Sequence, residues 1–353
     1  MSENQHTERI AQQLKAQRPF VLYSDFNKTQ FKAIFQNSSK AYKTSGFDKD
    51  GFVFVPFDLN QPAYIIPNNL SEQASYKLPQ SKDSFFSSKI QTSNEKAHKE
   101  LIKKAIHNIF ETNLEKVVLA RSCEIEFSIL DPIGLFHNIA KAYPEAYTYC
   151  WFHPCTGFWL GASPESLVKI SGNKVQLVAL AGTQRFNNQS QVDWDPKNIK
   201  EQSMVTDYLK NNLSNHLSAL SVSKPRTIRS ANLLHLQTTI TGHINKGKYV
   251  LRNLLWGLHP TPAVCGSPKE NAMAFIKENE TLDREFYSGF LGTIKQDSFG
   301  DLESANLVVN LRCMQLMSKK ALLYAGGGIT SQSTPDMEWE ETEAKMQTLK
   351  SIF

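Results

Sequence analysis

The chain has 353 residues, of which 41% are hydrophobic and 21% charged, and 39 basic against 34 acidic side chains give it a net charge of +5. This composition excludes a disordered chain, a collagen and a coiled coil, and no apolar run approaches the ~18 residues of a membrane-spanning helix. The basic residues are scattered along the sequence, so we expect neither nucleic acid nor a membrane as partner.

Cysteine content and the N-terminus indicate a compartment. The five cysteines are an odd number without a C-x-x-C pair, which disfavours a disulfide framework or a zinc site and favours free thiols. The first 19 residues contain no apolar stretch after a basic cluster, so we expect no secretory signal. We therefore expect a cytoplasmic protein, and the length allows either two domains or one large one.

The first half of the chain mixes strand and helix patterns. Alternation predicts a strand at 51–57, and a Ser-, Lys- and Gln-rich composition predicts a loop or linker at 80–94. Apolar residues at roughly helical spacing predict a helix over 95–110, a β-branched run predicts a strand over 117–127, and a second helix is expected over 132–142.

Short strands follow in pairs. The stretches 147–152 and 157–162 are aromatic strands that could form a hairpin, and 167–170 and 175–180 flank the turn Ser171–Asn173. Strand pairs joined by turns and mixed with helices are typical of an α+β protein with antiparallel sheets.

Two Pro dipeptides predict helix starts. In Asp195-Pro196 the Asp is the expected N-cap and Pro the first helical residue, and apolar residues then recur every four positions. That stripe contains Val205, Leu209, Leu213 and Leu217. Ser267-Pro268 predicts a helix start of the same kind, running to about Asn279.

The last part of the chain contains a run of glycines. Strands are expected over 307–316 and 321–325, Gly326 to Gly328 follow, and a helix is expected over 337–350. Consecutive glycines after a strand let backbone N–H groups converge on an anion, although a plain tight turn is an equal alternative. The spacing fits neither a dinucleotide fingerprint nor a phosphate-binding P-loop.

Several charged residues interrupt apolar patterns. Glu201 heads the apolar stripe of its helix, and Glu338, Glu341 and Lys345 share one face of the last helix. These carboxylates are either solvated and helix-stabilising or hard oxygen ligands for Mg²⁺. Lys116 opens its strand as either a surface lysine or, if buried, a base.

Glu165 lies between two apolar strands and is either a turn residue or a general acid. The role of Glu165 can be narrowed when the stretches of sequence around it and further along the chain are considered together. These stretches are KVVLAR (116–121), GASPESLV (161–168), LAGTQR (180–185), HPTPAVCG (259–266), FYSGFLG (286–292), NLRC (310–313), YAGGGI (324–329) and EWEETEAK (338–345).

Taken in this order, the eight stretches resemble the chorismate-utilising enzymes, the family of isochorismate, salicylate, anthranilate and aminodeoxychorismate synthases. The resemblance covers residues 95–350, the expected catalytic core, whereas residues 1–95 match weakly. It implies one α+β domain over 1–353, with two large antiparallel sheets packed face to face and helices outside. A monomer or weak homodimer is expected.

Three positions distinguish the members of the family. Lys116 resembles the members that add water, since those that add nitrogen are expected to carry Gln there. Ala181 stands where aminodeoxychorismate synthases carry a nucleophilic Lys, and Ala263 resembles isochorismate synthases. The expected activity is Mg²⁺-dependent isochorismate formation from chorismate, for menaquinone or siderophore synthesis. Salicylate synthase, and less so an anthranilate synthase component, are the alternatives.

The resemblance also implies roles for individual residues. Lys116 is the expected base for water and Glu165 the acid for the leaving hydroxyl. Glu201 and Glu341 are the expected Mg²⁺ ligands, with Glu338 in support. Substrate contacts are expected from a larger set, comprising Gly182, Thr183, His235, Ala263, Arg312, Gly326, Gly327, Gly328 and Lys345.

Overall fold

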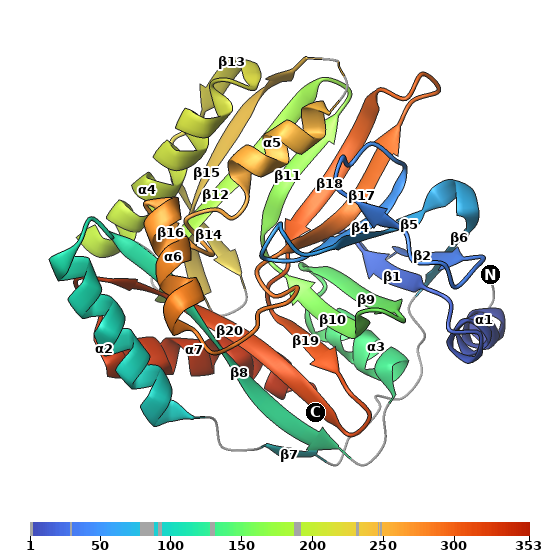
Figure 1. Ribbon diagram of the computed structural model, residues 1–353, viewed down its shortest axis with the longest axis horizontal. Coiled ribbons are helices and arrows are strands. Elements are labelled where there is room, and N and C mark those ends of the chain that lie inside the picture. The colour runs from blue at the N-terminus through green and yellow to red at the C-terminus, as the bar shows by residue number, and fades with distance from the viewer. Residues whose placement is uncertain are drawn as a thin grey trace.

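The fold was analysed in a computed structural model that describes residues 3–28, 30–77, 88–90, 94–127, 131–186, 192–230, 233–245, 247 and 249–353. Within this part of the chain the strands form two sheets, and every strand pairing is antiparallel. Helices lie on the outer faces of the two sheets (Figure 1). None of the described helices combines the length and apolar character needed to cross a bilayer.

The first sheet contains the strand that Lys116 begins. Its order is β16 (Gly266–Ser267), β8 (Lys116–Phe127), β20 (Lys320–Thr330), β19 (Cys313–Leu316), β10 (Gly157–Ser163), β9 (Tyr147–His153), β1 (Phe20–Ser24), β2 (Gln30–Gln36) and β6 (Ser71–Lys77), with β7 (Ser88–Ile90) beside β8.

The second sheet faces the first. Its order is β13 (Leu217–Val222), β15 (Leu233–Ile244), β12 (Lys174–Arg185), β11 (Ser166–Ser171), β18 (Leu302–Val309), β17 (Phe290–Gln296), β4 (Gly51–Val55), β5 (Ala63–Pro67) and β3 (Lys43–Thr44), with β14 (Arg226–Ser230) beside β15. Strands that precede residue 95 contribute to both sheets, so the weakly matching N-terminal part belongs to the same sheets as the core.

Aromatic side chains fill the space between the sheets. Phe54 of β4 stacks on Phe286 at 4.2 Å between ring centroids, and its ring lies 5.0 Å from that of Trp151 on β9. The predicted alternation of 51–57 is confirmed along β4, because Phe52 and Phe54 face this aromatic layer while Val53 and Val55 face the opposite core.

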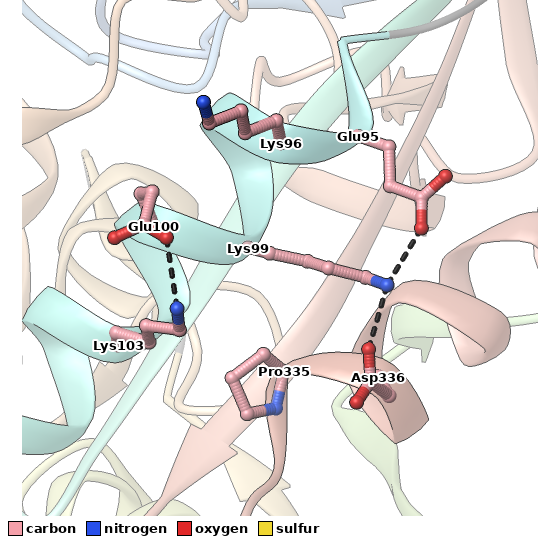
Figure 2. A pocket seen from close by; sticks show the side chains of 7 residues that line it. All are labelled: Glu95, Lys96, Lys99, Glu100, Lys103, Pro335 and Asp336. Carbon is pink, nitrogen blue, oxygen red and sulfur yellow. Dashed lines mark hydrogen bonds and ion pairs between the residues drawn. The ribbon is translucent and has the colours of Figure 1, made fainter.

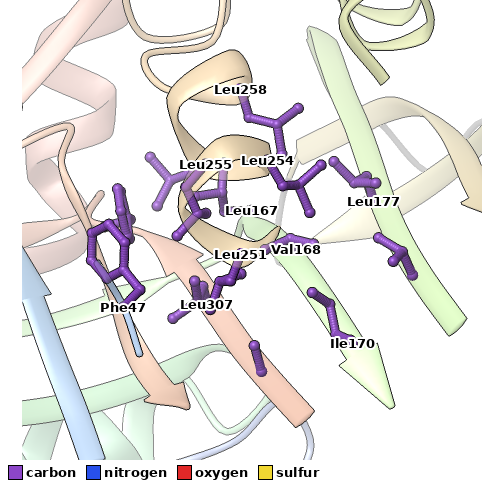
Figure 3. Packing of buried hydrophobic residues seen from close by; sticks show 14 of the residues in the cluster. Phe47, Leu167, Val168, Ile170, Leu177, Leu251, Leu254, Leu255, Leu258 and Leu307 are labelled. Carbon is purple, nitrogen blue, oxygen red and sulfur yellow. The ribbon is translucent and has the colours of Figure 1, made fainter. Parts of the chain in front are cut away.

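The outer faces of the sheets are covered by helices. On the second sheet, α4 (Pro196–Leu213) and α5 (Val250–Leu258) bury their leucines against β11, β12 and β18, as Figure 3 shows for α5. On the first sheet lie α1 (Glu3–Lys15), α2 (Glu95–Glu111), α3 (Pro132–Ala142), α6 (Lys269–Asn279) and α7 (Pro335–Lys350). The expected α+β class with two facing antiparallel sheets is confirmed.

Local signals located several helices correctly. Asp131 caps α3 by accepting from the Gly134 N–H (2.9 Å), and Asp195 caps α4 by accepting from the Asn198 N–H (2.9 Å), in each case before a first-turn Pro. Thr334 does the same for α7, which also begins with Pro335. The predicted helix over 95–110 is α2.

Four expectations about elements were wrong. The stripe ending in Leu217 continues past α4, which stops at Leu213 because the chain turns and Leu217 begins β13. The helix expected after Ser267-Pro268 is α6 and ends at Asn279 as predicted, but the expected cap is wrong, because Ser267 is the last residue of β16 and α6 begins without a side-chain cap. The stretch 307–316 is two strands in different sheets. Residues 88–90, predicted as loop, pair with β8, and most of 80–94 lies outside the described residues.

Candidate active site

Two crossings between the sheets lie side by side and define the candidate site. After β10 the chain passes through Pro164 and Glu165 into β11, and after β18 it passes through Asn310 to Arg312 into β19. Backbone hydrogen bonds hold the crossings together: Val309 N–H donates to Glu165 O (3.0 Å) and Ala162 N–H donates to Arg312 O (3.0 Å). Glu165 and Arg312, far apart in sequence, are therefore neighbours where the sheets separate.

Glu165 is a part-buried carboxyl surrounded by cations. Burial raises its pKa to about 7, while the positive charges of Arg312, Lys116 and Lys345 act in the opposite direction. Both protonation states are therefore populated near neutral pH, which is what a proton donor working at that pH requires. Of the two interpretations the sequence allowed, this environment favours the general acid over the plain turn residue.

Lys116 lies in the same electrostatic neighbourhood. As the first residue of β8 it pairs with Ser267 of β16 on one side and Thr330 of β20 on the other, and only 5% of its surface is exposed. The expected burial of Lys116 is confirmed. A surface role at the strand end is excluded because adjacent strands enclose it on both sides.

The three glycines lie inside a strand. Gly326 to Gly328 pair with Val118 to Ala120 within the β8–β20 ladder, which excludes the alternative of a tight turn. The strand expected over 321–325 was too short, because β20 runs on to Thr330. The strand continues because these residues keep their pairing with β8. Glycine suits Gly326 in particular, since a Cβ there would lie 3.0 Å from Leu119 O and from the Tyr287 hydroxyl.

Two of these glycines nevertheless present backbone groups to the site. Val118 and Ala120 direct their own backbone groups away from β20, to Cys265, Arg284 and Glu280. In an antiparallel ladder their partners Gly328 and Gly326 must then point to the opposite edge of β20. The strand β19 covers that edge only along Ala321–Leu323, and Gly326 O accepts from Lys345 Nζ (2.8 Å).

Helix α7 carries the predicted carboxylates across the outer face of β20 (Figure 1). Glu338 is 2% exposed and accepts from Ser333 Oγ (2.5 Å), whereas the Glu341 side chain is 40% exposed and pairs with Lys345 Nζ (2.6 Å). The two carboxylates are thus distinct: Glu338 is built into the packing of the helix, and Glu341 lies at the accessible edge.

His235 joins the site from the second sheet. A bulge in the β12–β15 ladder places Gly182 at a φ of +72°, and Gly182 O lies 3.2 Å from His235 Nδ1. Burial, together with the charges of Arg312 and Lys345, lowers the pKa of His235 to about 4, although the hydrogen bond to Gly182 and the charge of Glu341 act in the opposite direction. His235 is therefore neutral at pH 7, and the charges of Arg312 and Lys345 act on it as they do on Glu165.

The remaining predicted residues differ in how far they can be placed. Ala263 lies between α5 and β16, two residues before Cys265, whose carbonyl accepts from Val118 N–H (2.8 Å). The side chains of Thr183 and Glu201 lie outside the described part, although the backbone of α4 brings Asn198 against Gly182. Among the described side chains, no three His, Cys, Asp or Glu gather as a metal site.

Two residues near the site were quoted in motifs without a role. Tyr287 lies between the sheets, its hydroxyl 3.0 Å from where a Gly326 Cβ would be, with its ring stacked 5.4 Å from that of Tyr324. Arg121 follows Val117 and Leu119 on the same buried face of β8. A charged residue in phase with apolar strand positions was the signal that could have identified Arg121.

Comparison with known proteins gives a consistent result. The family model for chorismate binding enzymes matches residues 62–353. The chain is 30% identical over 312 residues to the vibriobactin-specific isochorismate synthase of Vibrio cholerae serotype O1, covering 84% of this chain and 78% of that protein. It is 32% identical over 250 residues to the isochorismate synthase EntC of Escherichia coli K12, covering 68% of this chain and 62% of that protein.

Structural similarity extends over almost the whole chain. The crystal structure of DhbC from Bacillus anthracis, named as a 2,3-dihydroxybenzoate-specific isochorismate synthase, superimposes with a TM-score of 0.80 at 26% identity. The superposition covers 98% of this chain and 99% of DhbC, so the described sheets and helices correspond throughout.

Proposed function

Because the chain belongs to the family of chorismate-binding enzymes, we propose that it is an isochorismate synthase that converts chorismate to isochorismate. The observation that carries the proposal is the carboxyl of Glu165, which lies among the cations of Lys116, Arg312 and Lys345 and has a pKa of about 7. Chorismate is a dianion whose conversion needs both positive charge and a proton donor at neutral pH. The relatives of this chain that are named isochorismate synthases support the same assignment.

The reaction assigns one residue to each proton transfer. Lys116 in its neutral form takes a proton from water, and the oxygen of that water bonds to ring carbon 2. Both ring double bonds shift, from carbons 1–2 and 5–6 to carbons 1–6 and 4–5, as the bond from carbon 4 to its hydroxyl breaks. Glu165 gives its proton to that hydroxyl, which departs as water. One water is consumed and one released, so the step is an isomerisation. Each such group typically contributes ~10²–10⁴-fold.

Substrate binding follows from the charges at the open edge of β20. Arg312 has the planar guanidinium suited to grip a carboxylate through two hydrogen bonds, and Lys345 and the N–H groups of Gly326 and Gly328 lie along the same edge. Neutral His235 and the Gly182 bulge close the pocket from the second sheet. Gly327 and Ala263 contribute shape, and Thr183 is assigned by its place in the motif.

The donor chemistry fits a magnesium ion. Glu341 offers an accessible carboxylate beside the substrate cations, and Glu201 comes from a helix whose first turn packs on the Gly182 bulge. Glu338, fully buried and hydrogen-bonded to Ser333, orients the helix that carries Glu341. When bound, Mg²⁺ would neutralise and orient the substrate carboxylate next to the attacked carbon.

The domain extent, pathway, compartment and oligomeric state are part of the same proposal. The proposed residues run from 116 to 345 and come from both sheets, so we assign one catalytic domain to residues 1–353. Menaquinone or siderophore synthesis is the proposed fate of the product. A cytoplasmic monomer or weak homodimer is proposed for the protein.

A product assay tests the proposal. Purified protein is incubated with chorismate and Mg²⁺ and the products are separated by chromatography, with a second reaction containing ammonia. Isochorismate alone is the expected product in both. Salicylate with pyruvate would instead identify a salicylate synthase, anthranilate in the ammonia reaction an anthranilate synthase component, and unchanged chorismate would refute the proposal.

A further inference from the structure

Arg121 is a buried cation that the proposed chemistry does not use. It lies on β8 and is 6% exposed. Its Nε donates to Thr342 Oγ1 (2.7 Å), its Nη2 bonds Glu343 Oε1 (2.5 Å), and its guanidinium lies 3.8 Å from the centroid of the Trp339 ring. All three partners are on α7, within five consecutive residues. A buried cation with such partners is costly to disturb, because they compensate its desolvation.

Trp339 is part-buried and contacts two side chains from outside α7. The guanidinium of Arg121 covers one part of its ring, and the ring of His98 on α2 lies 6.0 Å away. Burial together with the charge of Arg121 lowers the pKa of His98 to about 4. The imidazole is therefore neutral at pH 7 and does not compete with Arg121 for the electron-rich ring.

A second contact to α7 is exposed and serves for comparison. Lys99 of α2 reaches Glu95 and Asp336, both at 2.6 Å, as Figure 2 shows at the first turn of α7. The Asp336 side chain is 79% exposed, and exposed pairs of this kind contribute little to stability. Arg121 and Lys99 therefore contact the same helix with very different burial.

We propose that Arg121 is a positioning residue that sets the placement of α7 on β20, and through it the placement of Glu341 and Lys345. Thr342 directly follows Glu341 and precedes Lys345 by three residues, so the bond from Arg121 fixes the turn that carries both. Lys345 Nζ donates to Gly326 O and pairs with Glu341, and a slip of one residue along α7 would rotate both side chains by ~100°. This inference rests on the proposed function for the identity of the ligands.

The test measures metal binding and helix order without turnover. Mn²⁺ binding in the absence of chorismate, followed by electron paramagnetic resonance, is compared for the wild type, Arg121→Met, Arg121→Lys and Lys99→Met. Hydrogen exchange of residues 335–350 is measured on the same samples. We expect Arg121→Met to bind Mn²⁺ roughly 10–100-fold more weakly and to exchange faster in α7. Arg121→Lys should be intermediate, because Lys lacks the planar fork, and Lys99→Met should change affinity less than about 2-fold.

Two outcomes overturn the proposal: wild-type Mn²⁺ affinity in folded Arg121→Met, or an equal loss in Lys99→Met. If Arg121→Met does not fold, Trp339→Leu removes only the aromatic partner and leaves the cation in place. That variant must then show faster exchange in α7 and weaker Mn²⁺ binding, and wild-type values would refute the role. Failure of the wild type to convert chorismate would refute the proposed function alone, since the exchange comparison needs no turnover.

Discussion

Replacing Glu165 by Gln tests whether this carboxyl is kept for chemistry at the expense of stability. The pKa of Glu165 is raised from 4.5 to about 7 by burial, so the folded protein holds a proton that the unfolded chain releases across this interval. The wild type therefore loses stability as pH rises from about 4.5 to 7. Gln has no proton to lose, so Glu165→Gln should show no such loss.

The magnitude follows from the size of the shift. A rise of the pKa from 4.5 to about 7 means that full burial destabilises the ionised carboxylate by roughly 3 kcal/mol relative to the protonated form. Solvent reaches part of this carboxyl, and screening reduces the effect to about 1–2 kcal/mol. Glu165→Gln should therefore gain about that much stability over the wild type at pH 8 and almost none at pH 5, while turnover falls ~10²–10⁴-fold with the loss of the acid.

Urea unfolding at pH 5, 6, 7 and 8 measures the stability difference, and chromatography of the products measures turnover. Glu303→Gln, at an exposed position of β18, removes the same charge and is the matched control. A stability difference for Glu165→Gln that does not change with pH would refute the raised pKa. Wild-type turnover in the same variant would remove Glu165 from the proton-transfer step. Wild-type turnover should also decline above about pH 7, because the acid Glu165 ionises there.

Two further substitutions test the other proposed roles. Lys116→Gln should lower isochorismate formation ~10²–10⁴-fold while calorimetry still detects chorismate binding, because the binding cations Arg312 and Lys345 are intact; normal turnover would exclude Lys116 as the base. Glu341→Gln should raise the Mg²⁺ concentration for half-maximal activity by at least ~10-fold, with exposed Glu340→Gln as control. Wild-type activity that survives EDTA would contradict the metal requirement.

Local sequence signals located elements whose ends depend on neighbouring residues. Asp195 before Pro196 marked the start of α4 because capping satisfies backbone groups within one turn. The same reasoning failed at Ser267, because pairing with Lys116 of β8 draws this residue into β16. The apolar stripe likewise failed to mark the end of α4, because Leu217 pairs with Ile244 of β15 instead of forming another helical turn.

The residues of the candidate site were also predictable from the sequence only in part. Lys116, Glu165 and the last-helix carboxylates stood out in the sequence because charged residues interrupted apolar patterns, and the ordered motifs indicated the family. The stretch 307–316 read as one strand, since nothing local marks the point where the chain leaves one sheet for the other. That crossing is what brings Arg312 beside Glu165.

By itself, the sequence determined the α+β class, the family and the residue types available for chemistry, because periodicity, capping and motif order are local properties of the chain. Only the tertiary structure decided that Gly326 to Gly328 lie within a strand, that the pKa of Glu165 rises to about 7, and that Arg121 is enclosed by α7. Burial and charge at these positions come from segments far apart in the chain: Lys116 lies 49 residues before Glu165, and Glu343 lies 222 residues after Arg121.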